Sequence, residues 1–208
     1  MLKTLRKIFT KCKLIGFSGI FKCLLKKIYI NILWLFYNFD RWHVSSIFEC
    51  RTYKSIVVNA VNKLNPKTVV ELGCGLGEII SRINSINKFG IDIDQKIINA
   101  AKCLYGKRGS FYKGGFDKVI SFNQDNIDVL VMCNWIHNIC QEELRSEIHK
   151  LLNRKTIRYI IADSIEEMVI GYRYKHNIGD LFNGIAIIKE VSDDGGEKIR
   201  KIYSLEVI

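Results

Sequence analysis

The stretch Lys67-Thr-Val-Val-Glu-Leu-Gly-Cys-Gly-Leu-Gly-Glu78, followed by Phe89-Gly-Ile-Asp-Ile-Asp94, decides the fold. Its two valines are typical of a buried strand, and the three alternate glycines let the backbone turn tightly and approach a ligand before a helix begins. The second strand is expected to end at Asp92, nineteen residues after Gly73. An α/β nucleotide-binding fold places a carboxylate there to accept hydrogen bonds from ribose hydroxyls. The pattern therefore predicts a nucleoside site.

The glycine spacing excludes the commonest phosphate-binding loops. The dinucleotide fingerprint G-x-G-x-x-G requires glycine where the chain has Glu78, and no Gly-Lys-Ser/Thr follows. The expected ligand is a nucleoside without a pyrophosphate. The segment resembles the first motif of the class I S-adenosylmethionine-dependent methyltransferases, acidic-x-G-x-G-x-G, which is matched by Glu71, Gly73, Gly75 and Gly77. The alternative is a glycine-rich turn that only connects a strand to a helix.

The resemblance implies S-adenosyl-L-methionine as the cofactor. In the family the motif surrounds the methionine and ribose part, and the carboxylate after the second strand binds the ribose hydroxyls. Many relatives end the third strand with Gly-Asp, whereas this chain has Lys113-Gly-Gly-Phe-Asp117. The implied contacts are Glu71, Gly73, Gly75 and Gly77 in the motif, Asp92 on ribose, Ile93 and Phe116 against adenine, and Asn134 on the methionine part or on substrate.

Composition indicates one folded domain with an appendage. The chain has 208 residues, of which 48% are hydrophobic, and this excludes a disordered protein. Its seven cysteines are scattered without any C-x-x-C pair. Neither a metal site nor a disulfide framework is expected, and the compartment indicated is the reducing cytoplasm.

The positive charge is concentrated at the N-terminus. Residues 1–41 hold nine Lys or Arg against one acid, Asp40, so that eight of the eleven net charges lie there. Leucine, isoleucine and phenylalanine recur between them at helical spacing, which predicts a basic amphipathic helical arm over residues 1–40. The uncharged run over residues 28–38 is too short to span a bilayer.

Two interpretations of this arm stay open. Residues 1–38 either lie on an anionic membrane surface, peripheral to the inner face of the cell membrane, or dock on the domain or on a second subunit.

Residues 41–208 are expected to form the methyltransferase domain. From Thr68 onward, short apolar runs alternate with helical patterns, which is typical of a Rossmann-like, doubly wound parallel sheet. Two later runs flank Asp194-Gly-Gly196 and predict an antiparallel hairpin, which completes the seven-stranded sheet that the resemblance implies. The expected strands are 68–72, 89–93, 110–113, 127–133, 157–162, 184–191 and 198–207, and the expected helices are 47–64 (capped by Ser45 or Ser46), 78–86, 95–105 and 141–152.

The family builds its acceptor site where the fourth and fifth strands end. His137 follows the fourth strand and is the first candidate for the general base, because an imidazole titrates near neutral pH. Its alternative is a core histidine bonded to backbone. Asp163 ends the expected fifth strand and either orients a base, holds a sugar hydroxyl or starts a helix.

A third group of candidates lies between the fifth strand and the hairpin. Tyr172 is expected to stack on an acceptor ring, and Arg173 and His176 to meet a phosphate or carboxylate. The alternative is a solvated loop.

Three functions compete. The first is O-methylation of a small molecule or saccharide, free or carried on a lipid or nucleotide. The others are methylation of nucleic acid (RNA) and non-catalytic binding of S-adenosylmethionine. Base-N-methylating relatives have Asn/Asp-Pro-Pro-aromatic where this chain has Asn134-Trp-Ile-His137, and the basic excess lies on a helix with bulky apolar residues, so nucleic acid is disfavoured. The basic arm and compact domain are similar to small bacterial methyltransferases of surface-polysaccharide or glycolipid assembly.

Overall fold

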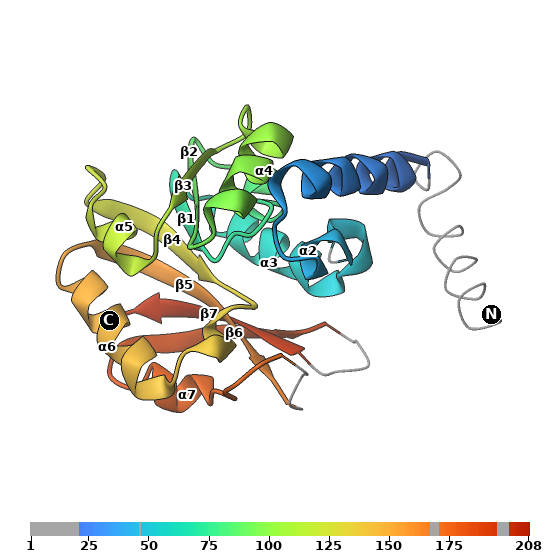
Figure 1. The fold of residues 1–208 in the computed structure, drawn as a ribbon. Helices are drawn as coiled ribbons and strands as arrows, with labels where there is room; N and C mark the ends of the chain where they lie inside the picture. The colour runs from blue at the N-terminus through green and yellow to red at the C-terminus, as the bar shows by residue number, and fades with distance from the viewer. Residues whose placement is uncertain (1–20, 46, 167–170, 195–199) are drawn as a thin grey trace.

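A single seven-stranded sheet organises the protein. The computed structural model describes residues 21–45, 47–166, 171–194 and 200–208 (Figure 1). The strand order is β3-β2-β1-β4-β5-β7-β6, and β7 runs antiparallel to both of its neighbours while the remaining pairs are parallel. The strands are β1 Thr68–Leu72, β2 Asn87–Asp92, β3 Ser110–Lys113, β4 Asn126–Met132, β5 Thr156–Ile165, β6 Ala186–Asp193 and β7 Arg200–Val207. The predicted doubly wound sheet with a C-terminal antiparallel hairpin is confirmed.

Helices cover both faces of the sheet because consecutive residues of its central strands are apolar and point to opposite faces. Val69 belongs to one hydrophobic cluster and Val70 to the other, and Val129 and Leu130 divide in the same way. α3 and α4 pack on the first face and α5, α6 and α7 on the second (Figure 1). The helices are α2 Trp42–Ser45, α3 Thr52–Lys63, α4 Gln95–Tyr105, α5 Phe116–Ile120, α6 Gln141–Leu152 and α7 Ile178–Leu181, with 3₁₀ turns η1 Phe48–Cys50, η2 Ile80–Arg82 and η3 Ile136–Asn138.

The arm helix, residues 21–37, docks on the first face of the domain. Its Ile30 and Leu33 are buried in the same cluster as α3 and α4, and Phe39 joins them just after the helix. The Tyr37 hydroxyl lies 3.2 Å from the Cys103 sulfur of α4. A domain boundary at residue 40 therefore does not separate two cores. Residues 1–20 of the predicted arm lie outside the described residues.

No helix in the described ranges is both long enough and apolar enough to cross a membrane. This holds for the arm helix, whose lysines interrupt its apolar residues.

The predicted helix over residues 47–64 is interrupted. Arg51 adopts an extended conformation with φ −131° and ψ 100°, so η1 ends before it and α3 begins at Thr52. Ser45 does not cap a helix that follows, because its hydroxyl donates back to the Trp42 carbonyl within α2. Ser46 lies outside the described residues.

The predicted helix over residues 78–86 is wrong. A turn and the short η2 replace it, and β2 begins at Asn87, two residues earlier than predicted. Only nine residues separate Gly77 from this strand, which is too few for a regular helix and the return to the sheet. Ile80 and Ile83, three residues apart, are both buried, and the tighter 3₁₀ turn places such residues on one side.

The fifth strand is longer than predicted. β5 continues to Ile165 because it pairs with β7 as far as the contact between Ile165 and Arg200. Asp163 therefore lies inside a strand opposite Ile202, and neither ends the strand nor starts a helix.

Candidate functional site

The glycine loop after β1 requires its glycines. Gly73, Gly75 and Gly77 have φ values of +70°, +52° and +76°, in the left-handed region that favours glycine. A Cβ atom on Gly73 would lie 2.2 Å from Cδ1 of Trp135, and one on Gly77 would lie 2.4 Å from Cε1 of Phe111. The loop backbone is thus packed directly against two aromatic side chains.

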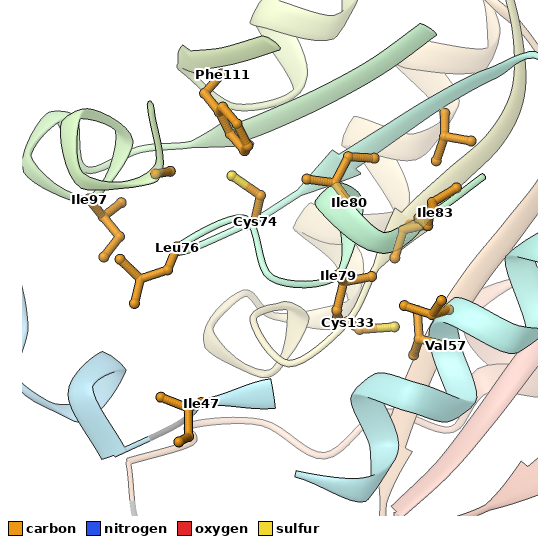
Figure 2. Packing of buried hydrophobic residues seen from close by; sticks show 14 of the residues in the cluster. Ile47, Val57, Cys74, Leu76, Ile79, Ile80, Ile83, Ile97, Phe111 and Cys133 are labelled. Atoms are coloured by element: carbon orange, nitrogen blue, oxygen red, sulfur yellow. The ribbon is translucent and has the colours of Figure 1, made fainter. Parts of the chain in front are cut away.

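Side chains between the glycines anchor this loop to the core. Cys74 and Leu76 are buried, and Figure 2 shows Cys74 directed towards Phe111 and Leu76 beside Ile97. Apolar burial of this kind helps to hold a loop in one conformation. Hydrogen bonds fix it as well, because the amides of Cys74 and Gly77 donate to the carbonyl oxygens of Ile91 and Cys74 at 3.0 and 2.8 Å.

Asp92 joins the end of β2 to the same loop. Its carboxylate accepts hydrogen bonds from the Gly75 amide at 2.9 Å and from the Asp94 amide at 3.1 Å. Burial raises the pKa of Asp92, against the lowering effect of these amides. Asp94 instead caps α4 by accepting from the Lys96 amide at 2.8 Å. Ile93 follows Asp92 and is largely exposed, so its side chain is open to a ligand.

Glu71 holds the far side of the loop. Its carboxyl group is buried and accepts a 2.9 Å hydrogen bond from the Ile80 amide. Burial raises the pKa of Glu71 to about 8, although the Ile80 amide and Lys54 oppose the shift. The carboxyl group is consequently mostly protonated at neutral pH.

Glu78, which directly follows the glycine motif, lies between two lysines. Lys54 from α3 donates to its carboxylate at 2.7 Å, and Lys26 from the arm helix contacts the other carboxylate oxygen. Lys26 also pairs with Glu49 at 3.1 Å. Burial works to raise the pKa of Glu78, but Lys54 and Lys26 outweigh it and lower the pKa. The arm helix is thereby tied to the loop by charge as well as by apolar contact.

A pocket opens between this loop and the helices that precede β1. His43 lies over the loop, because a Cβ atom on Gly75 would be 3.0 Å from its Cε1 atom. Trp42 stacks on His43 with ring centres 3.9 Å apart. Burial, aided by the charge of Lys54, lowers the pKa of His43 to about 4, so its imidazole is neutral at pH 7. The pocket is lined by Trp42, His43, Tyr53, Lys54, Glu71, Gly73, Cys74, Gly75, Leu76, Glu78, Ile79, Cys133 and Asn134.

The sequence did not single out the N-terminal side of this pocket. Trp42, His43, Tyr53 and Lys54 all precede β1 and approach the loop only through the tertiary fold. The available sequence signal is the pair of Trp and His in Arg41-Trp-His-Val44. A ring with an apolar face and a polar atom can pack on a ligand and also form a hydrogen bond with it.

Asp163 anchors a polar cluster behind the pocket. Its Oδ1 accepts from the Asn134 amide at 2.8 Å, and its Oδ2 contacts Arg200 and lies 3.4 Å from Nε2 of His137. Burial works to raise the pKa of Asp163, but His137 and Arg200 reverse the effect and lower it. Asp163 is therefore a buried carboxylate balanced by charge. His137 is fully buried as well and does not line the pocket.

Asn134 links this cluster to the pocket. Its φ is +72°, a conformation that asparagine tolerates better than most residues. The Tyr172 hydroxyl donates to the Asn134 side-chain oxygen at 2.6 Å and accepts from Arg200 at 2.9 Å. Arg200 also lies over the ring of Tyr53, 4.5 Å from its centre. Asn134 is thus held at its backbone amide by Asp163 and at its side-chain oxygen by Tyr172.

The remaining predicted residues are divided between core and surface. Phe116 is buried, with its ring 5.8 Å from that of Trp135. Arg173 is exposed. His176 is buried, its Nε2 lies 3.0 Å from the Ile136 carbonyl oxygen, and burial lowers its pKa. The structure brings Tyr172 to the cluster but brings neither Arg173 nor His176 to the pocket. Among the described residues, no group of three or more His, Cys, Asp or Glu side chains is placed to hold a metal ion.

Comparisons with known proteins identify the fold around this pocket. Residues 70–160 match a family model described as a methyltransferase domain. The curated protein sequences contain no significant match. Among solved structures, the chain is similar to magnesium protoporphyrin IX methyltransferase from Synechocystis PCC 6803 with bound SAH, at 15% identity and a TM-score of 0.61 over 85% of this chain and 93% of that one.

Two further structures share the fold. The N-methyltransferase NodS from Bradyrhizobium japonicum WM9, in complex with S-adenosyl-L-homocysteine, has 11% identity and a TM-score of 0.67 over 81% of this chain and 92% of that one. The bifunctional kinase-methyltransferase WbdD has 16% identity and a TM-score of 0.56 over 76% of this chain and 39% of that one.

Proposed function

We propose that this chain, whose residues 70–160 match a methyltransferase domain, is a class I S-adenosylmethionine-dependent methyltransferase that methylates a hydroxyl group of a small molecule or saccharide. S-adenosylmethionine supplies the methyl group when bound. The residues present fit it, because the left-handed glycine loop leaves space that a Cβ atom on Gly75 would fill, beside the carboxylate of Asp92. Gly73, Gly75, Asp92 and Asn134 would hold the cofactor at the carboxyl ends of β1, β2 and β4.

The observation that carries the proposal is the position of His43 in the pocket, over Gly75. A hydroxyl becomes a better nucleophile when a base accepts its proton in the transition state. Because the pKa of His43 is lowered to about 4, its imidazole is a weaker base than usual, but it is unprotonated at neutral pH and can accept that proton. His43 would accept the proton of the acceptor hydroxyl while the bound cofactor supplies the methyl group.

The side chains around His43 suit a ring-shaped acceptor. Trp42 and Tyr53 both line the pocket, and an aromatic face packs against the apolar side of a ring while leaving its polar groups free. Near-attack alignment requires that the acceptor oxygen be held about 3 to 3.5 Å from the methyl carbon. Positioning by these two rings is therefore as important as the base.

We assign His137 and Asp163 a positioning role in place of direct proton transfer. Both side chains are fully buried, and they act on the pocket through Asn134, whose amide Asp163 holds. This assignment changes the role that the sequence suggested for His137, because a general base must reach the proton that it removes.

For the acceptor, we favour a saccharide carried on a lipid or nucleotide, in surface-polysaccharide assembly at the cytoplasmic face of the membrane. The support is the basic arm, in which residues 1–41 hold eight of the eleven net positive charges. Methylation of RNA is the alternative function, and the same experiment tests it.

The experiment offers labelled S-adenosylmethionine and the purified full chain to cell extract separated into lipid, aqueous small-molecule and RNA fractions. We expect label in the lipid or aqueous fraction as an alkali-stable methyl ether. Label in RNA, or only in alkali-labile methyl esters, would contradict hydroxyl methylation of a saccharide.

Two variants then separate the histidines. His43→Asn should retain cofactor affinity, measured by calorimetry, and lose on the order of 10²-fold in turnover, the usual size of a general-base contribution. His137→Asn should lose less turnover and more thermal stability, since it disturbs the buried partner of Asp163. If His137→Asn loses more turnover than His43→Asn, then His137 is the base and the assignment of His43 is wrong.

A further inference from the structure

The arm helix has apolar side chains on two opposite sides. One side is occupied, because Ile30 and Leu33 are buried in the core and Lys26 reaches Glu78. The other side is open to solvent in the described part of the chain. It carries Phe21, Leu24, Leu25, Ile28, Tyr29, Ile32, Leu35 and Phe36.

These outward residues form one continuous stripe. At 100° per residue, all of them fall within one arc of the helix. They therefore share a single face over more than four helical turns. Leu35 and Phe36 are 72% and 80% exposed. Soluble proteins rarely expose contiguous apolar surface of this extent unless it binds a partner or a membrane. The arm helix lies at the margin of the molecule, beside α3 and α4 and away from α5, α6 and α7 (Figure 1).

The charges beside the stripe indicate the occupant. At 100° per residue, Lys22 and Lys27 fall on its two flanks, and both are exposed. The sequence before the helix adds Lys3, Arg6, Lys7, Lys11 and Lys13 without any acid. An apolar face bordered by lysines matches the boundary between acyl chains and anionic headgroups. A second copy of the chain is a poorer match, because pairing two such faces would bring the flanking lysines of both copies together.

We propose that the outward face of the arm helix binds the surface of an anionic bilayer, with its apolar side chains inserted and its lysines at the headgroups. The docked side remains attached to the domain, so binding requires no unfolding of the helix from the core. The first pocket residue, Trp42, follows the last helical residue by five positions, which spans at most about 18 Å. The pocket is therefore held near the lipid surface.

The test uses flotation of the full chain with two kinds of vesicle, phosphatidylcholine alone and phosphatidylcholine containing 30% phosphatidylglycerol (a composition chosen to give about the anionic content of a bacterial membrane). The chain should float with the anionic vesicles, and the bound fraction should fall at least about tenfold with neutral vesicles or in about 0.5 M salt. Equal binding to both vesicles, or binding to neither, would overturn the proposal.

A pair of double variants locates the binding face. Leu35→Glu with Phe36→Glu should lower the fraction bound to anionic vesicles at least about tenfold, since charged residues are costly to insert into the apolar region of a bilayer. The matched control is Ile86→Glu with Ile187→Glu, two exposed isoleucines outside the arm, of which Ile86 is 81% exposed. The control should float like the parent.

Thermal unfolding and cofactor binding establish that both double variants are folded. If the arm variant floats as well as the control, the outward face is not the binding surface. If the parent sediments as a dimer that the arm variant dissociates, and does not float, the stripe binds a second copy and the lipid proposal is wrong.

Discussion

Asp92 and Asp94 are two residues apart and differ in what they hold. Asp92 closes the glycine loop over β2, and Asp94 caps α4. We propose the ligand-facing role for Asp92, because its carboxylate lies at the strand end beside the pocket loop, where ribose hydroxyls are expected to donate to it. The cap carries no such role.

We therefore expect Asp92→Asn to weaken S-adenosylmethionine binding about 10- to 100-fold. A hydrogen bond to a charged group contributes roughly 1.5 to 3 kcal/mol, and each 1.4 kcal/mol is a factor of ten in affinity. Isothermal titration calorimetry with the cofactor and with its demethylated product measures the change. Asp94→Asn is the control, since asparagine caps a helix as well as aspartate does. Equal affinities for the two variants would remove Asp92 from the cofactor site.

The histidines show where residue-level prediction from sequence ends. His137 was chosen because it follows a buried strand, yet burial of a side chain is set by what packs on it, here Tyr172 and His176. His43 lies before the first strand, and its position over Gly75 depends on a contact between residues that are thirty-two positions apart. Local patterns contain no information about such a contact.

At the scale of single elements, Glu71 in β1 makes the stability of the protein depend on pH. Glu71 has an ordinary carboxyl pKa when the chain is unfolded and a pKa raised to about 8 by burial in the folded chain. Between these values the folded state binds more protons than the unfolded state, so stability from Glu71 is present at low pH and is lost as the pH rises through 8.

The free energy of unfolding should accordingly fall by on the order of 1 kcal/mol between pH 6.5 and pH 8. Glu71→Gln should remove this dependence, because the amide oxygen still accepts from Ile80 but has no proton to lose. Urea unfolding at four pH values in this window measures it. Glu142→Gln, an exposed control in α6, should keep the slope of the parent. A parent curve that is flat or rising in this window would show that burial does not hold the proton on Glu71.

Element prediction succeeded where a strand or helix is specified by its own residues. The bounds of β1, β3, α4 and α6 coincide with the predicted ranges because each has a complete apolar pattern and clear flanking signals. The end of β5 was not predictable in this way, since residues 163–165 are strand only through pairing with β7, thirty-five or more positions away. The segment after Gly77 failed because its isoleucines fit a helix, whereas the distance to β2 leaves room for only one tight turn.

At the scale of the whole molecule, the arm helix contributes to the stability of the domain. Lys26→Met removes the contacts with Glu78 and Glu49 and leaves the ion pair between Lys54 and the buried Glu78 carboxylate. We expect a loss of about 1 to 3 kcal/mol in the free energy of unfolding, the usual cost of removing one partner of a buried polar group.

Lys27→Met is the matched control for this change. Lys27 is exposed on the same helix, and exposed substitutions usually stay within about 0.5 kcal/mol. Urea denaturation of both variants under one set of conditions gives the comparison. If Lys26→Met is no less stable than Lys27→Met, the ion pairs across the arm do not stabilise the fold.

Glu78 connects the pocket with the arm helix. It lines the pocket directly after the glycine motif, and it also pairs with Lys26 of the arm helix, whose other side faces outward. Any ligand that moves this carboxylate changes the free energy of helix docking, and thermodynamic reciprocity requires that an event at the helix change the affinity of that ligand by the same factor. From the proposed lipid binding, we therefore expect lipid and nucleoside to act as heterotropic effectors of one another through the Glu78 carboxylate.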